Sequence, residues 1–114
     1  MERPKLLIVE DDPQIGRLLK RFLCNFDCTV ASNSADGVDF VRRDTFDAII
    51  TDWDCPGFSS GQLVVNEAKL YGIPLLIHTA NCSVEIDGVK TLQKPCDIKT
   101  IEMELFTLIG SLNV

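Results

Sequence analysis

Residues 5–13 read Lys-Leu-Leu-Ile-Val-Glu-Asp-Asp-Pro, in which four apolar residues are followed directly by three acidic residues and a proline. A continuous apolar run of this length is typical of a strand buried on both faces of a parallel sheet. Asp12 can cap a helix and Pro13 fits its first turn, so a helix is predicted to begin here. The stretch therefore predicts the first β-α unit of an α/β fold.

Short apolar runs and helical periods continue to alternate along the rest of the chain. Further strands are predicted at residues 28–31, 48–51, 73–77 and 89–92. Further helices are predicted from Ser34, as the cap, to about Arg43, from about Ser60 to Tyr71 with Gly72 as the stop, and after Asp97 as the cap. Five β-α repeats imply one parallel sheet with helices on both sides.

Two of these helices carry apolar residues at spacings of three and four, which predicts a face packed on the sheet. In the first helix the predicted face consists of Ile15, Leu18, Leu19, Phe22, Leu23 and Phe26. In the last helix it consists of Ile98, Ile101, Leu105, Leu108, Ile109 and Leu112.

The composition limits the class of protein. The chain has 114 residues, 46% of them hydrophobic, which is enough for one domain spanning residues 1–114. Its 17 acidic and 11 basic residues give a net charge of −6, which disfavours direct binding to nucleic acid. No apolar run approaches the roughly 20 residues of a membrane helix, and the N-terminus lacks the pattern of an export signal. These features predict a cytoplasmic protein with no membrane partner, in which the five cysteines are free thiols.

Polar residues follow four of the predicted strands: Glu10 and Asp11 the first, Asp52 the third, Thr79 the fourth and Lys94 the fifth. The carboxyl ends of parallel strands meet at one edge of a sheet, so these side chains are expected to converge. Carboxylates this close repel one another unless a hard cation binds, and Mg²⁺ also leaves room for phosphate oxygens. The pattern predicts phosphoryl chemistry with an Asp carboxylate as nucleophile, a lysine that neutralises charge and a hydroxyl that donates a hydrogen bond.

Four motifs resemble those of response-regulator receiver domains, and the likeness runs from Leu6 to Leu112. They are Leu-Ile-Val-Glu-Asp-Asp-Pro at 7–13, Thr-Asp-Trp-Asp-Cys-Pro-Gly at 51–57, His-Thr-Ala at 78–80 and Gln-Lys-Pro at 93–95. The resemblance implies the flavodoxin-like, CheY-like α/β fold, a doubly wound five-stranded parallel sheet in the order 2-1-3-4-5.

The resemblance also implies a role for each matching residue. Asp52 would be the phosphoacceptor, Glu10 and Asp11 the acidic pair of a Mg²⁺ site, and Asp54 a metal ligand through its backbone carbonyl. Thr79 would be the switch hydroxyl, and Lys94 the lysine at the phosphoryl site, often followed by a cis proline. The implied function is that of a phosphoprotein in a two-component phosphorelay. It would receive its phosphoryl group from a histidine kinase or a histidine phosphotransfer protein, act on an unknown downstream protein, and dephosphorylate itself slowly without being an enzyme in the usual sense.

The chain departs from the family pattern in two segments. Only 14 residues separate Thr79 from Lys94, fewer than receivers usually have, so the family's fourth helix is expected to be very short or absent around residues 81–88. The family's aromatic switch position holds Thr91, so a rotating aromatic cannot couple to Thr79. The loop after Asp52 is also expected to be one residue longer than usual, and Asp54 adds a carboxylate near the phosphoryl site.

Other functions fit the residues less well. A degenerate receiver would act only as a docking module, but the acidic pair, acceptor, threonine and lysine are all present. A haloacid-dehalogenase-like phosphohydrolase would place its Asp-x-Asp after the first strand, whereas Asp52 and Asp54 follow the third. A dinucleotide-binding domain would need a glycine-rich turn after the first strand, where this chain has Glu-Asp-Asp-Pro.

The remaining candidate ligands have simpler interpretations. Cys55, Cys82 and Cys96 follow predicted strands, but no CxxC or CxxH spacing supports a metal or redox site, so incidental thiols are expected. His78 is expected to be a strand side chain packed under a helix rather than a ligand or sensor.

Overall fold

A computed structural model describes residues 2–53, 61–80 and 83–111 of the chain. In chain order the elements are β1 (Lys5–Val9), α1 (Pro13–Phe22), β2 (Asp27–Ala31), α2 (Ser34–Arg43), β3 (Ala48–Thr51), α3 (Gly61–Tyr71), β4 (Leu75–Thr79), β5 (Lys90–Gln93) and α4 (Ile98–Ser111). None of the helices in these residues is long and apolar enough to cross a membrane.

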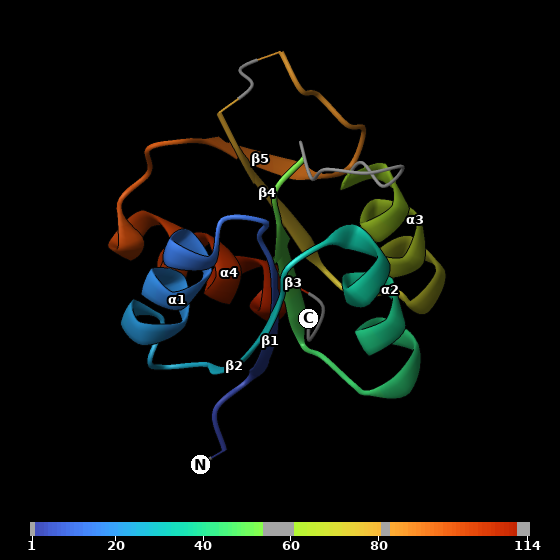
Figure 1. Cartoon of the computed structure of the whole chain (residues 1–114), viewed down its shortest axis with the longest axis horizontal. Helices are drawn as coiled ribbons and strands as arrows, with labels where there is room; N and C mark the ends of the chain where they lie inside the picture. The colour runs from blue at the N-terminus through green and yellow to red at the C-terminus, as the bar shows by residue number, and fades with distance from the viewer. Residues whose placement is uncertain (1, 54–60, 81–82, 112–114) are drawn as a thin grey trace.

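The five strands form one sheet in the order β2-β1-β3-β4-β5, and all neighbours run parallel. Figure 1 shows α1 and α4 on one side of this sheet and α2 and α3 on the other. Each side has its own apolar core, because successive strand residues point to opposite faces. Leu7 and Ile49 belong to the core under α2 and α3, whereas Ile8 and Ile50 belong to the core under α1 and α4. The predicted fold class and strand order are confirmed.

The observed start of α1 agrees with the prediction. The Asp12 carboxylate accepts a hydrogen bond of 2.9 Å from the Gln14 amide, and Pro13 is the first helical residue. The predicted apolar face is wrong in part, because Leu18 and Phe22 are each 50% exposed. Leu19 is buried against the sheet. Leu18 is one position away and so rotated by about 100° from Leu19, and Phe22, four residues after Leu18, lies on the same exposed side of the helix.

The helix also ends earlier than its apolar pattern. α1 stops at Phe22, so the buried side chains of Leu23 and Phe26 lie in the turn that follows it. Their burial does not depend on helical geometry.

Four other boundaries differ from the prediction, and the first is that of β2, which begins at Asp27 rather than Cys28. The cap of α2 is Asn33, whose side-chain oxygen accepts from the Asp36 amide at 2.8 Å, and Ser34 is the first helical residue. β4 begins at Leu75 rather than Ile73 and continues through the polar residues His78 and Thr79. β5 is displaced by one residue to Lys90–Gln93, in register with this longer strand.

The ends of α3 and α4 agree with the prediction within the described residues. Gly72 has a φ of 68°, a left-handed conformation that suits glycine after a helix. The Asp97 carboxylate accepts from the Thr100 amide at 2.7 Å and caps α4. Ile101 and Leu105 are fully buried and Leu108 packs against the same core, whereas Leu112 lies outside the described residues.

The connection between β4 and β5 is described at Ala80 and at residues 83–89, and these residues form turns and irregular backbone rather than a helix. Val84, Ile86 and Val89 are partly buried and pack against the core under α2 and α3. Residues 81–82 lie outside the described part of the chain.

Candidate functional site

Glu10 is held at the end of β1 by its backbone and its side chain. Its amide donates to the Ala31 carbonyl at 3.0 Å, which continues the β1–β2 ladder by one residue. One carboxylate oxygen accepts from the Asp12 amide at 3.3 Å, and the residue is only 3% exposed. Burial raises the pKa of this carboxyl group, although the hydrogen bond with Lys94 opposes the shift.

Asp52 occupies the equivalent position after β3. Its amide donates to the Val9 carbonyl at 2.9 Å, and the Thr51 hydroxyl donates to the Asp52 carbonyl at 2.9 Å. With 8% of its surface exposed, Asp52 is nearly as buried as Glu10. The backbone therefore fixes both carboxylates at the carboxyl ends of adjacent strands.

Gly61 lets α3 approach the end of β3 closely. Its amide donates to the Trp53 carbonyl at 2.7 Å. A Cβ atom at this position would lie 2.8 Å from the Asp52 carbonyl oxygen and 2.9 Å from the Trp53 Cα, both of them backbone atoms. The role of Gly61 was not predicted, because its only signal in the sequence is a glycine at the start of a predicted helix.

Glu10, Asp11 and Asp52 each offer a carboxylate oxygen, and these atoms lie within 4.8 Å of one another. Asp11 is the most exposed of the three, so the cluster opens to solvent on its side. A set made only of oxygen atoms suits a hard divalent cation such as Mg²⁺. The structure thus brings together the three acidic residues predicted for the metal site.

Lys94 forms ion pairs with two of these carboxylates. Its ammonium nitrogen lies 2.9 Å from Glu10 Oε2 and 3.1 Å from Asp52 Oδ2, and its side chain is 17% exposed. Burial lowers the pKa of Lys94, but the two carboxylates outweigh that effect and leave the pKa raised. The Lys94 amide donates to the Thr79 carbonyl at 2.7 Å, and the Lys94–Pro95 peptide bond is cis, as the resemblance implied.

Thr79 and His78 lie at the end of β4, next to this cluster. Thr79 is fully buried. His78 is 6% exposed, and neither of its ring nitrogens has a hydrogen-bond partner among the residues that the structure describes. Burial and the nearby Lys94 charge lower the pKa of His78 to about 4, so the ring is neutral at pH 7. His78 is a packed strand side chain as predicted, but its missing partner was not foreseen.

Known proteins resemble this chain in both sequence and fold. A scan against protein-family models found no match. The chain is 32% identical to the rice two-component response regulator ORR21 over 108 residues, which is 88% of this chain and 15% of that protein. It is 30% identical to the chemotaxis protein CheY of Pseudomonas aeruginosa over 82 residues, 67% of this chain and 66% of that protein.

Solved structures agree with these relatives. A sensor protein from Polaromonas superposes with a TM-score of 0.85 at 27% identity over 96% of this chain and 98% of that one. The receiver domain of the sensor histidine kinase PA1611 from Pseudomonas aeruginosa, which holds a magnesium ion in its active-site cleft, superposes with a TM-score of 0.79 at 24% identity over 94% and 98%.

The chain has the CheY-like receiver fold. Sequence relatives and structural neighbours together support a response-regulator receiver domain. The chain spans only 15% of the length of the rice relative, so the activities and partners of whole response regulators do not transfer to it directly.

Several residues with predicted roles lie outside the described part of the chain. They are Asp54, whose backbone carbonyl is a predicted metal ligand, the loop after Asp52 that is predicted to be longer than usual, and the predicted incidental thiols Cys55 and Cys82. Cys96 is described and partly buried, and burial raises the pKa of its thiol. Within residues 2–53, 61–80 and 83–111, the carboxylate cluster is the one group of His, Cys, Asp and Glu that could hold a metal ion.

Proposed function

We propose that this receiver domain accepts a phosphoryl group on Asp52 in a two-component phosphorelay. The observation that carries the proposal is the position of the Lys94 ammonium, which contacts Glu10 and Asp52, the two buried members of an all-carboxylate cluster. A cation placed between an acceptor carboxylate and a metal-site carboxylate can neutralise the charge that a phosphoryl group brings.

The proposed metal is Mg²⁺, held by Glu10, Asp11 and Asp52 together with the backbone carbonyl of Asp54. The oxygen-only donor set of the first three residues supports this choice. When bound, Mg²⁺ would supply positive charge to the phosphoryl oxygens. The magnesium ion in the PA1611 receiver supports the same assignment by similarity.

The proposed reaction is an in-line transfer. An Asp52 carboxylate oxygen forms a bond to phosphorus while the bond from phosphorus to the donor's leaving atom breaks, and the donor departs with that bonding electron pair. Lys94 contacts the new phosphoryl oxygens, and the Thr79 hydroxyl donates to one of them. Slow return to the resting state follows when water attacks phosphorus and inorganic phosphate leaves, which regenerates the Asp52 carboxylate.

The proposed output differs from that of receivers with an aromatic switch. The described residues 83–89 between β4 and β5 form no helix, which supports a shortened or missing family helix there. Thr91 replaces the switch aromatic, and its buried hydroxyl has no hydrogen-bond partner in the described chain. We therefore assign the response to phosphorylation to a rearrangement of the β4–β5 connection, which packs through Val84, Ile86 and Val89.

The proposed partners are a histidine kinase or a histidine phosphotransfer protein as donor, and an unidentified protein as downstream target. Relatives among response regulators and hybrid histidine kinases support a kinase donor. We propose that residues 1–114 act as one regulatory domain in the cytoplasm without contacting nucleic acid directly, in line with the net charge of −6.

Intact-mass spectrometry tests the acceptor directly. The protein, Asp52→Asn and the surface control Asp36→Asn are incubated with acetyl phosphate, each with and without Mg²⁺. The expected result is one phosphoryl adduct that requires Mg²⁺, forms on the protein and on Asp36→Asn, and is missing from Asp52→Asn.

Two outcomes would contradict the proposal. An adduct that persists in Asp52→Asn would move the acceptor to another residue. Failure of the folded protein to form any adduct with acetyl phosphate or with a phosphorylated phosphotransfer protein would favour the phosphorylation-independent docking module.

A further inference from the structure

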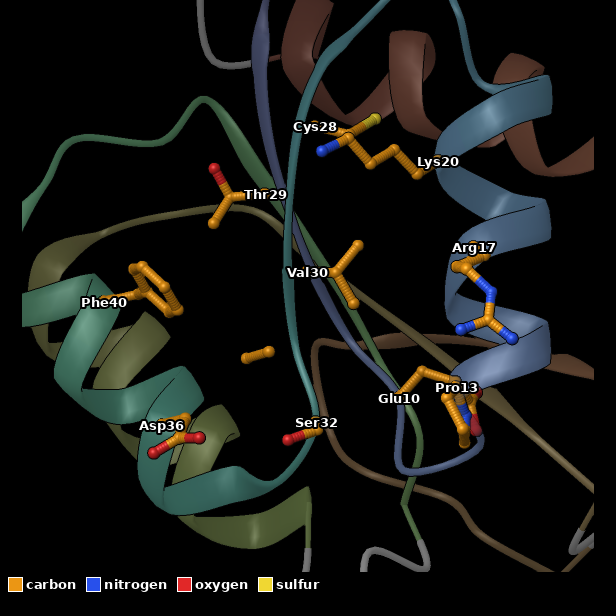
Figure 2. Close-up of a pocket in the computed structure, with 11 residues that line it drawn as sticks. Glu10, Pro13, Arg17, Lys20, Cys28, Thr29, Val30, Ser32, Asp36 and Phe40 are labelled. Atoms are coloured by element: carbon orange, nitrogen blue, oxygen red, sulfur yellow. The ribbon is translucent and has the colours of Figure 1, made fainter.

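An open groove runs along β2, the outermost strand on one edge of the sheet. The groove has a volume of about 640 Å³ and lies between α1 and α2. Figure 2 shows β2 crossing between the two helices, with Arg17 and Lys20 on the α1 side and Phe40 on the α2 side. The groove floor is the strand itself, from Cys28 to Ser32.

The backbone of β2 offers free pairing positions to this groove. The Asp27 amide donates to the Pro4 carbonyl, and the Ala31 carbonyl accepts from the Glu10 amide, so alternate residues beginning at Asp27 face β1. In an extended strand the N–H and C=O of one residue point to the same side. The backbone groups of Cys28 and Val30 therefore point outward, where no strand of the described chain pairs with β2.

The outward positions of β2 carry no residue that blocks a sheet edge. Exposed edges are commonly blunted by charged residues, especially lysine, or by proline within the strand. β2 reads Asp-Cys-Thr-Val-Ala, and its one charged residue, Asp27, stands at the first position with its backbone paired toward β1. An edge whose outward positions are Cys28 and Val30, with unpaired backbone, is a template for an added strand.

The two walls of the groove differ in chemistry. Arg17 and Lys20 are exposed, and neither forms an ion pair with another described residue. On the other wall Phe40 is partly buried and apolar. Side chains of an added strand would alternate between these walls, so residues facing α1 should be acidic and residues facing α2 should be apolar.

We propose that the β2 groove binds an extended segment of a partner protein in which acidic and apolar residues alternate. The segment would add a strand beside β2 through the backbone groups of Cys28 and Val30. Its acidic side chains would pair with Arg17 and Lys20, and its apolar side chains would pack on Phe40. This site lies beside the acidic cluster but uses none of its carboxylates.

Electrostatic repulsion disfavours two other occupants of the groove, a nucleic acid and a second copy of this chain. A nucleic-acid backbone would place phosphates along the whole groove, and Glu10 and Asp36 at its far end would repel them. Two β2 edges paired about a two-fold axis normal to the sheet would place two α1 helices on the same face. The Arg17 and Lys20 side chains of the two copies would then repel one another.

Synthetic peptides of the same length as β2, blocked at both ends, test the proposal on the full chain. One peptide alternates Glu and Val, a second alternates Lys and Val, and a third is the Glu-Val peptide with N-methylated backbone amides. The Glu-Val peptide should shift the backbone NMR signals of residues 28–32 and slow hydrogen exchange at the Cys28 and Val30 amides. The Lys-Val and N-methylated peptides should bind about tenfold more weakly or not at all.

Variants separate charge from backbone pairing. The double variant Arg17→Glu with Lys20→Glu should weaken binding of the Glu-Val peptide at least about tenfold. Lys90→Glu with Lys99→Glu, an equal charge change on exposed residues elsewhere, is the matched control and should bind normally. Val30→Pro removes one outward N–H without breaking a β1 hydrogen bond, so it should lose binding, whereas Val30→Ala retains the N–H and should keep it.

Three results would overturn the proposal. Equal binding of the Glu-Val and Lys-Val peptides would remove the charge argument, and normal binding by Val30→Pro would remove the added strand. Dimerisation of the protein in solution, with shifts confined to β2 that the Glu-Val peptide does not displace, would make a second copy the occupant. Formation of the acetyl phosphate adduct by each variant checks its fold, so a failed phosphorylation experiment and a failed peptide experiment remain distinguishable.

Discussion

Two polar sites lie side by side at the carboxyl ends of the strands, and they satisfy their buried groups differently. In the first, the Lys94 ammonium contacts Glu10 and Asp52, so each buried charge has an opposite charge within 3.1 Å. In the second, the His78 ring is equally buried and neither nitrogen has a partner in the described chain. At this end of the sheet buried charge is therefore retained where it is paired, and the unpaired group stays neutral.

Among the changes at these two sites, removal of Lys94 should have the largest effect on the free energy of unfolding. Lys94→Met leaves two buried carboxylates without a cation and should lower the free energy of unfolding by about 4 kcal/mol at pH 7. Urea denaturation measures the loss, and Lys90→Met, which removes an exposed lysine from β5, the strand just before Lys94, is the control. Mg²⁺ should restore part of the stability of Lys94→Met. A loss no larger than that of Lys90→Met would mean that the pair contributes little in solution.

The stability of the protein should fall in acid because His78 is neutral in the folded state. Its pKa is about 4 in the folded protein against 6.5 for the free side chain, and the charges facing it are Lys94 and Asp52. The unfolded chain therefore binds more protons between these values, so stability from this residue is complete above pH 6.5 and is lost as the pH falls toward 4. The loss should be on the order of 3 kcal/mol.

This pH dependence is measured as a difference between the protein and His78→Leu, in buffers without Mg²⁺. The carboxylates titrate in both proteins, so their contribution cancels in the difference. Parallel curves for the two proteins from pH 7 to pH 4 would show that His78 is solvated or protonated in the folded state.

A smaller effect should follow when His78 is replaced at constant pH. His78→Leu removes two buried nitrogens that lack partners and should raise the free energy of unfolding at pH 7 by about 1–2 kcal/mol. His78→Asn, which keeps a polar group at the same position, should not. Destabilisation by the leucine would indicate that the imidazole has a hydrogen-bond partner in solution.

The smallest effect is expected at Thr91, whose buried hydroxyl also lacks a partner in the described chain. Thr91→Val replaces that hydroxyl with a methyl group of similar size and should stabilise the domain by about 1 kcal/mol or less. The matched change Thr100→Val, on a residue that is part of the α4 cap, should not be stabilising. If Thr91→Val lowers stability, water or a neighbouring group satisfies the hydroxyl.

Most of the fold was predictable because its signals are local. A buried parallel strand is a continuous apolar run, so β1 and β3 were predicted with their observed bounds. Errors arose where the local signal is ambiguous: Asn33 and Ser34 are both good caps, and only the structure shows that Asn33 accepts the hydrogen bond. β4 extends beyond its apolar run because pairing with β5, rather than hydropathy, includes His78 and Thr79 in the strand.

At the candidate site, too, some features could be predicted from local sequence signals and others could not. The carboxylate cluster could be predicted because parallel strands must bring their carboxyl ends to one edge. The two contacts of Lys94, the missing partner of His78 and the close approach of Gly61 depend on side-chain packing between elements distant in sequence. No local pattern carries that information.

The glycine at the start of α3 has a mechanical consequence. Because no side chain intervenes, the first amide of the helix lies 2.7 Å from the carbonyl of the residue that follows Asp52. In its second half, α3 contacts α2 through the ion pair of 2.8 Å between Glu67 and Arg42. β3, α3 and α2 are therefore linked one after another, and a displacement at Asp52 would reach α3 through the Trp53 carbonyl, so Gly61 ties the position of α3 to that of Asp52.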